Sequence, residues 1–138
     1  MTTYRAMLIA AATVLCGTMV AQAQMADVKT YFKTAVAGKE STFDFFYAVK
    51  LDCTPIDWME VRIVQQPDMG KAEITKGTVL MQYPDANPRS KTCNGKPTMG
   101  HLLVFTPSKK AAGDDKIVVE VVTSSGGSFR RVYDVTVM

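Results

Sequence analysis

The stretch KIVVEVVTSSGGSFRRVYDVTV, residues 116–137, decides the fold class. In its first half, apolar residues alternate with others and place three side chains on one face: Ile117, Val119 and Val121. A period of two is typical of a β-strand with one buried face. Residues 124–128 have the composition of a hairpin loop, and residues 129–137 form the returning strand. The stretch therefore predicts a β-hairpin.

The same alternation recurs along the chain before this hairpin. The further segments predicted as strands are residues 42–49, 59–63, 72–74, 78–83 and 101–106. Turn residues separate them, as in Gln66-Pro67-Asp68-Met69-Gly70, where proline and glycine break the pattern. Most of these strands have one polar face, which disfavours a parallel sheet buried between helices. Six or seven such strands predict an all-β domain, either a β-sandwich or a small open barrel.

Residues 24–41 allow more than one interpretation. Apolar residues recur there at near-helical spacing before Gly38: Met25, Val28, Phe32 and Val36. This spacing fits a short amphipathic helix, while a strand or an extended N-terminal arm fits equally well. We therefore expect an arm or short helix over residues 24–41 and the β-domain over residues 42–138.

Residues 1–23 have the composition of a signal peptide. Arg5 precedes an uncharged apolar run, and Ala21-Gln22-Ala23 has the small-x-small pattern of a signal peptidase site. An uncleaved membrane anchor is the rival interpretation, whereas lipidation at Cys16 is disfavoured by the bulky Leu15. We expect cleavage near Ala23, a periplasmic or secreted protein, and no stable membrane insertion afterwards.

Composition excludes several classes of function. The 138 residues carry a formal net charge of +3, which is too small to argue for nucleic acid binding. A single histidine, His101, excludes histidine pairs within one chain, and no serine lies in a nucleophile elbow. Paired carboxylates for acid–base catalysis are offered by Asp52 with Asp57 or by Asp114 with Asp115, and the adjacent pair in the Gly-Asp-Asp turn is expected to bond local backbone amides instead. The sequence therefore predicts no enzyme and no cofactor.

Two cysteines, Cys53 and Cys93, remain after the signal segment. In an oxidising compartment two cysteines usually pair, and a loop of this length gives about 3–4 kcal/mol of stabilisation. A free thiol or a metal pair has no support, since there is no C-x-x-C motif. We predict a structural disulfide.

A long irregular stretch, residues 84–100, contains three prolines and Cys93. A loop of this length in a small domain is usually anchored or functional. Cationic, aromatic and amide groups in and beside it predict a site for an anionic or glycan ligand: Tyr83, Arg89, Lys91 and Lys96, with Asn87 and Asn94. The pair Arg130-Arg131 is interpreted as a guard on an edge strand.

Copper binding is the alternative function. Met99 and His101 lie two residues apart, so an extended chain places both on one side, and Met69 and Met81 are candidate neighbours. Thioether and imidazole ligands suit copper. Methionine more commonly fills gaps in cores, and known copper carriers generally use several histidines.

Residues 56–137 resemble the bacterial immunoglobulin-like and cadherin-like domains of secreted and surface proteins. The resemblance is carried by the turn at residues 66–70, by Phe105-Thr106-Pro107, by Gly113-Asp114-Asp115 and by the closing hairpin. It implies an immunoglobulin-like β-sandwich of about seven antiparallel strands and a binding or interaction module with a protein or glycan partner in the cell envelope. The calcium ligands of some relatives are not matched, since Asp114 and Asp115 stand alone.

Overall fold

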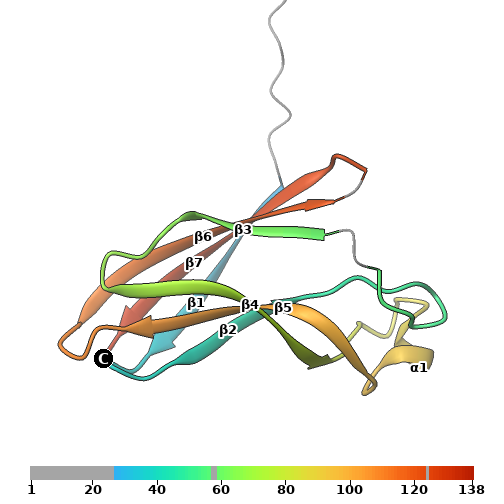
Figure 1. The fold of residues 1–138 in the computed structure, drawn as a ribbon, viewed down its shortest axis with the longest axis horizontal. Helices are drawn as coiled ribbons and strands as arrows, with labels where there is room; N and C mark the ends of the chain where they lie inside the picture. The colour runs from blue at the N-terminus through green and yellow to red at the C-terminus, as the bar shows by residue number, and fades with distance from the viewer. Residues whose placement is uncertain (1–26, 57–58, 124) are drawn as a thin grey trace, which may run out of the picture.

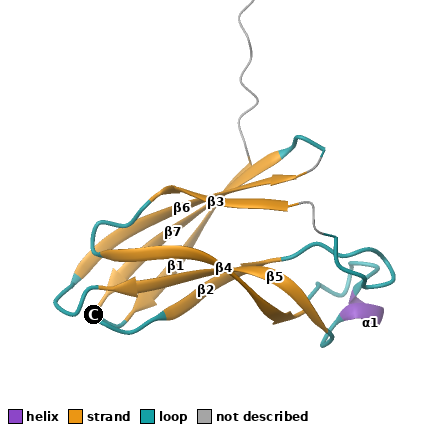
Figure 2. Cartoon of the chain, in the orientation of Figure 1, coloured by secondary structure: helices purple, strands orange, loops and turns teal. Residues whose placement is uncertain are grey.

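A computed structural model describes residues 27–56, 59–123 and 125–138 of the protein. In these residues seven strands and one short helix form two packed layers (Figures 1 and 2). The strands are β1 (Asp27–Ala35), β2 (Ser41–Phe46), β3 (Met59–Gln65), β4 (Gly70–Leu80), β5 (Pro97–Pro107), β6 (Gly113–Thr123) and β7 (Ser128–Val137), and the helix is α1 (Ser90–Cys93).

The strands divide into a four-stranded sheet with the order β1-β7-β6-β3 and a three-stranded sheet with the order β2-β5-β4. The prediction of an all-β sandwich is therefore confirmed, and the open barrel is not the arrangement observed. One pair departs from the expected antiparallel pattern, because β1 runs parallel to β7 from Asp27–Phe129 to Ala35–Val137. The chain crosses to the other sheet after β1, so β1 borders the last strand of the chain instead of β2.

Strand β1 also corrects the interpretation of residues 24–41. The helical alternative is wrong over residues 27–35, and the sandwich begins before residue 42. Of the apolar residues with helical spacing that the structure describes, Val28, Phe32 and Val36 are exposed, and Phe32 is 82% exposed. Tyr31 faces the core instead and stacks on Tyr133, with ring centroids 5.7 Å apart. The predicted signal peptide lies outside the described residues.

Three other strand boundaries differ from the prediction. The two short pieces expected on either side of Gly77 are one strand, β4, because all of β4 pairs without interruption with β5. Strand β5 begins at Pro97, so part of the expected irregular stretch belongs to the sheet. Strand β6 begins at Gly113, which places Asp114 and Asp115 in a strand and not in a turn. Pairing partners, which alternation alone does not reveal, extend each strand.

The main core lies between the two sheets. Strands β6 and β7 contribute three buried residues each, β2 and β5 two each, and β1 and β4 one each: Ala35, Phe43, Phe46, Ala72, Leu103, Phe105, Ile117, Val119, Val121, Tyr133, Val135 and Val137. A second small cluster, formed by Val49, Met81 and Cys93, lies under the loops that contain α1. The sandwich thus carries a separately packed end (Figure 2).

Candidate binding site

The β4–β5 hairpin extends beyond the main core, and its buried face changes along its length. Near the core, the pair Ala72–Phe105 faces the other sheet. Further along the same face, Leu80 and Met99 are 59% and 56% exposed. On the opposite face the paired Val79 and Thr98 are 7% and 6% exposed. The face of the hairpin that covers the core is therefore exposed at the far ends of the two strands, where the chain leads to and from α1 (Figure 1).

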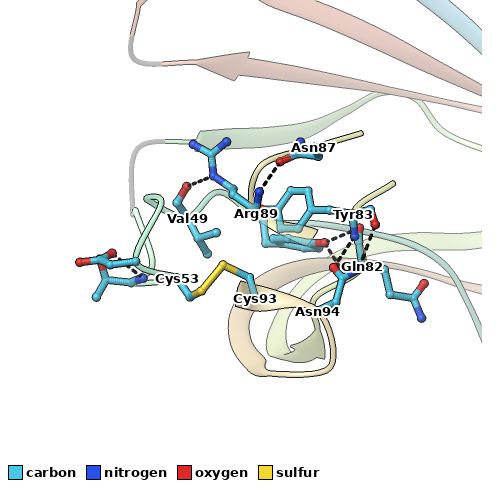
Figure 3. Close-up of a disulfide and its surroundings, with 11 residues drawn as sticks. Val49, Cys53, Gln82, Tyr83, Asn87, Arg89, Cys93 and Asn94 are labelled. Atoms are coloured by element: carbon cyan, nitrogen blue, oxygen red, sulfur yellow. Dashed lines mark hydrogen bonds between the residues drawn. A yellow bond between two sulfur atoms is a disulfide. The ribbon is translucent and has the colours of Figure 1, made fainter. Parts of the chain in front are cut away.

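We call this end of the sandwich the stapled end, because the predicted disulfide Cys53–Cys93 lies in it (Figure 3). The disulfide is confirmed, with the two Cα atoms 5.5 Å apart and a sequence separation of 40. Cys93 ends α1 and is fully buried beside Val49 and Met81. The disulfide thus ties the segment after β2 to the segment before β5.

The segment after β2 is held by further bonds. The Tyr47 hydroxyl donates to the carbonyl oxygen of Gln82 at 2.9 Å and accepts from the Gln82 amide at 2.8 Å. Val49 and Pro55 form an isolated antiparallel bridge, and the Ile56 amide donates to the Ala48 carbonyl at 2.8 Å. This segment is therefore a closed loop with fixed ends.

The predicted binding residues share the loop over residues 81–96, which we call the basic loop, but they play unequal parts. The Arg89 Nε donates to the Val49 carbonyl at 3.1 Å, while Figure 3 shows its guanidinium group directed away from the disulfide. Asn87 Oδ1 accepts from the Arg89 amide at 2.9 Å. Asn94 bonds both backbone groups of Tyr83, at 2.7 and 3.0 Å. The two asparagines therefore shape the loop.

Tyr83 is partly buried and packs edge-on against Tyr47, with ring centroids 5.6 Å apart. Burial, reinforced by Tyr47, raises the pKa of the Tyr83 hydroxyl above its ordinary value. The ring thus supports the loop, and its role as a ligand contact stays a prediction.

Lys91 and Lys96 are exposed on the same loop as Arg89. Among the described residues, none of these three cations lies within ion-pair distance of a carboxylate. The arginines of the sandwich differ, since Arg62 and Arg130 pair with Glu120 and Arg131 pairs with Asp44. The basic loop therefore presents positive charge that the described part of the chain does not neutralise.

A pocket of about 280 Å³, which we call the end pocket, opens beside the closed loop after β2. Its apolar lining comes from β2, β3, β5 and the closed loop after β2, and includes Phe46, Ala48, Ile56, Met59 and Met99. Lys76 and His101 supply the polar lining, and they are directly opposite each other in the β4–β5 register. The end pocket has the mixture of apolar walls and few polar groups that is usual for ligand sites.

Only some of the candidate copper ligands lie close together in the structure. Met99 and His101 line the end pocket together, as their spacing predicted, but Lys76 lies opposite the imidazole. Met69 and Met81 are separated by the length of β4, roughly 30 Å of extended chain. They are not neighbours, and Met81 is buried in the small cluster. In the described ranges, no three His, Cys, Asp or Glu residues gather as a metal site would require.

The structure also places the paired arginines of β7 and the aspartates named as candidate carboxylates. The edge-guard interpretation of Arg130 and Arg131 is wrong, because β1 covers β7 and makes it an inner strand. Asp115 accepts from the amides of Asp68 and Met69 at 3.0 and 2.8 Å, so it joins distant parts of the chain as well as its own neighbour. Asp52 accepts hydrogen bonds from the amide and the hydroxyl of Thr54, and the bond from the hydroxyl lowers the pKa of the Asp52 carboxyl. Asp57 lies outside the described residues.

Sequence reasoning missed Lys76 as a site residue and missed the ion pairs between strands. Lys76 lies 25 positions before His101, and only the register of two adjacent strands brings them together. The pattern of β4 contains one signal for this site. Lys76 and Thr78 are two residues apart in an extended strand, so they share the face opposite to the buried Val79.

Comparisons with protein-family models and with curated proteins found no match to the chain. The described residues include no helix that is long and apolar enough to cross a membrane.

Proposed function

We propose that the protein is an exported, non-enzymatic immunoglobulin-like module that binds an anionic protein or glycan of the cell envelope through the basic loop. The export rests on the signal-like sequence of residues 1–23. The immunoglobulin-like relationship is supported by the strand groups, since β2, β5 and β4 share one sheet and β3, β6 and β7 share the other. That division of the second to seventh strands is found in seven-stranded immunoglobulin sandwiches, whereas β1 lies beside β7 instead of joining the sheet of β2, β5 and β4.

One observation carries the binding function: three cations without ion-pair partners in the described residues lie on a loop of fixed shape. The disulfide, the two asparagines and the Arg89–Val49 bond hold this loop before any ligand arrives. Preorganisation reduces the entropy lost on binding. Concentrated positive charge accelerates and orients the approach of an anion.

The test is a titration of the ¹⁵N-labelled protein with a uronic acid oligosaccharide, and with a neutral glucose oligosaccharide of equal length. We expect shifts of the basic-loop amides with the anionic sugar only, weakening as salt rises. The triple variant Arg89→Gln, Lys91→Gln, Lys96→Gln should bind at least about tenfold more weakly. The matched control replaces Lys39, Lys109 and Lys110, which are exposed at the opposite end.

Thermal unfolding of both triple variants establishes that they fold. Equal loss in the two variants would indicate general charge attraction, and no loss in either would overturn the proposed role of the basic loop.

A further inference from the structure

The end pocket offers an apolar interior at the stapled end of the molecule. Phe46, Ile56 and Met59 approach it from two strands and from the closed loop after β2. Its volume, about 280 Å³, is close to the lower limit of small-molecule pockets. Removal of apolar ligand surface from water contributes about 25 cal/mol per Å². The interior therefore favours a short apolar chain or ring.

Two side chains that line the end pocket, Lys76 and His101, carry N–H groups that can donate hydrogen bonds. Lys76 and His101 are a direct cross-strand pair, and such pairs have Cβ atoms about 5 Å apart. Within the described part of the chain, neither side chain has an ion-pair or hydrogen-bond partner, and no carboxylate lines the pocket. Two such donors at this spacing can converge on one carboxylate group of a ligand.

The walls are held in place by covalent and hydrogen bonds. The Val49–Pro55 bridge and the Ile56–Ala48 hydrogen bond close the loop that forms one wall. The Cys53–Cys93 disulfide fixes this loop against the segment that leads into β5. Gly100 keeps the other wall close, because a Cβ atom there would lie 2.9 Å from the Phe46 carbonyl oxygen. The pocket is thus built before binding.

We infer that the end pocket binds a small carboxylic acid with an apolar chain, whose carboxylate contacts Lys76 and His101 and whose chain contacts Phe46, Ile56 and Met59. The inference rests on the proposed function, since it places a second binding element at the same stapled end. It adds a ligand class that the basic loop alone does not select, because an exposed loop has no enclosed apolar surface.

The experiment compares three ligands that share one chain: octanoate, octan-1-ol and octylammonium. Each is titrated into the ¹⁵N-labelled protein, and amide shifts are followed at Lys76, Met99, Gly100 and His101. We expect octanoate to bind most tightly and octylammonium to bind least. Lys76→Gln should weaken octanoate binding about tenfold, the usual loss for one charged hydrogen-bond partner. Lys71→Gln is the control, because Lys71 is exposed on the same strand outside the pocket.

Equal binding of the three ligands, or equal affinity of the Lys76 and Lys71 variants, would overturn the inference. Titration with copper alone is a further arm. Copper binding that disappears in His101→Ala, combined with no octanoate binding, would assign the pocket to the metal instead. The proposed function is tested separately, by titration with the uronic acid oligosaccharide. The Lys76→Gln variant should still bind this oligosaccharide. Absence of octanoate binding to the wild-type protein, with oligosaccharide binding present, would therefore reject the pocket ligand only.

Discussion

Arg131 of β7 and Asp44 of β2 form an ion pair between the two sheets, with Nη1 2.7 Å from Oδ2. The same carboxylate oxygen accepts a hydrogen bond from the buried hydroxyl of Tyr133. The Arg131 guanidinium lies 4.8 Å from the centroid of the Phe46 ring. Burial and the hydrogen bond to Asp44 raise the pKa of Tyr133 far above its ordinary value, so the hydroxyl stays a donor. The cluster connects the sheets next to the end pocket.

Replacement of Asp44 by asparagine should lower the free energy of unfolding by about 2 kcal/mol, since Arg131 loses its partner in a partly buried setting. Urea unfolding measures the change. The control is Asp134→Asn, which removes a more exposed ion pair of 3.6 Å to Lys116. That change should cost less than about 0.5 kcal/mol. Equal effects of the two substitutions would contradict a special role for the pair between sheets.

The double substitution Cys53→Ser, Cys93→Ser should lower the free energy of unfolding by about 3–4 kcal/mol, because a 40-residue loop is released in the unfolded chain. Guanidinium unfolding of the oxidised wild type and of the variant measures the difference. The native state should also lose order at residues 47–56 and 81–96 before the sandwich unfolds, which amide hydrogen exchange reports. Uniform loss of protection over all strands would argue against a separately packed end.

The ion pairs of Glu120 are expected to make the free energy of unfolding decrease at acid pH. Hydrogen bonds from Arg62, and then from Arg130, lower the pKa of its carboxyl below the ordinary value. A lowered folded-state pKa gives a stability contribution that is present above the unfolded-state pKa of about 4.3 and disappears as the pH falls through the folded-state pKa.

In urea unfolding at a series of pH values, wild type should therefore lose stability below about pH 4.5. Glu120→Gln should show a shallower decline over the same range. A variant curve parallel to that of wild type would show that other carboxylates dominate the acid limb.

Gly70 is predicted to tolerate no side chain. A Cβ atom at this position would lie 2.4 Å from the Thr106 carbonyl oxygen and 2.7 Å from the Pro107 Cα, both parts of the backbone of β5. Gly70→Ala should lower the unfolding free energy by about 2 kcal/mol or more through forced strand separation. Gly126→Ala is the comparison, since open space surrounds that position and only its φ of 81° opposes a side chain. It should cost about 1 kcal/mol by thermal or urea unfolding.

The sequence predicted the elements whose signals are local. The C-terminal hairpin has strict alternation and a glycine-rich turn, so both strands were found. The disulfide was predicted because only two cysteines follow the signal-like segment. Strand β1 was ambiguous because the spacing of Val28 and Phe32 belongs to its exposed face, while Tyr31 and Ala35 contact the core.

Features that depend on which strands are neighbours could not be predicted from the sequence. The inner position of β7 follows from the return of β1 to its side, and no local pattern around Arg130 records this. The end pocket needs the register that places Lys76 opposite His101, together with the change of buried face along the β4–β5 hairpin. The basic loop could be predicted because its charged residues lie close together in sequence. The hydrogen bonds of Asn94 and Tyr47 that hold it could not, because their partners lie elsewhere in the chain.

The pairing of β1 with β7 has a consequence for the order of events when the protein is made. Asp27 and Phe129 are partners, so the four-stranded sheet is incomplete until nearly the whole chain has been synthesised. Contacts between such distant positions form slowly, because a large loop must close first. The pairing of the first and last described strands thus makes the closing of the four-stranded sheet a late step of folding, which needs nearly the whole chain to be present.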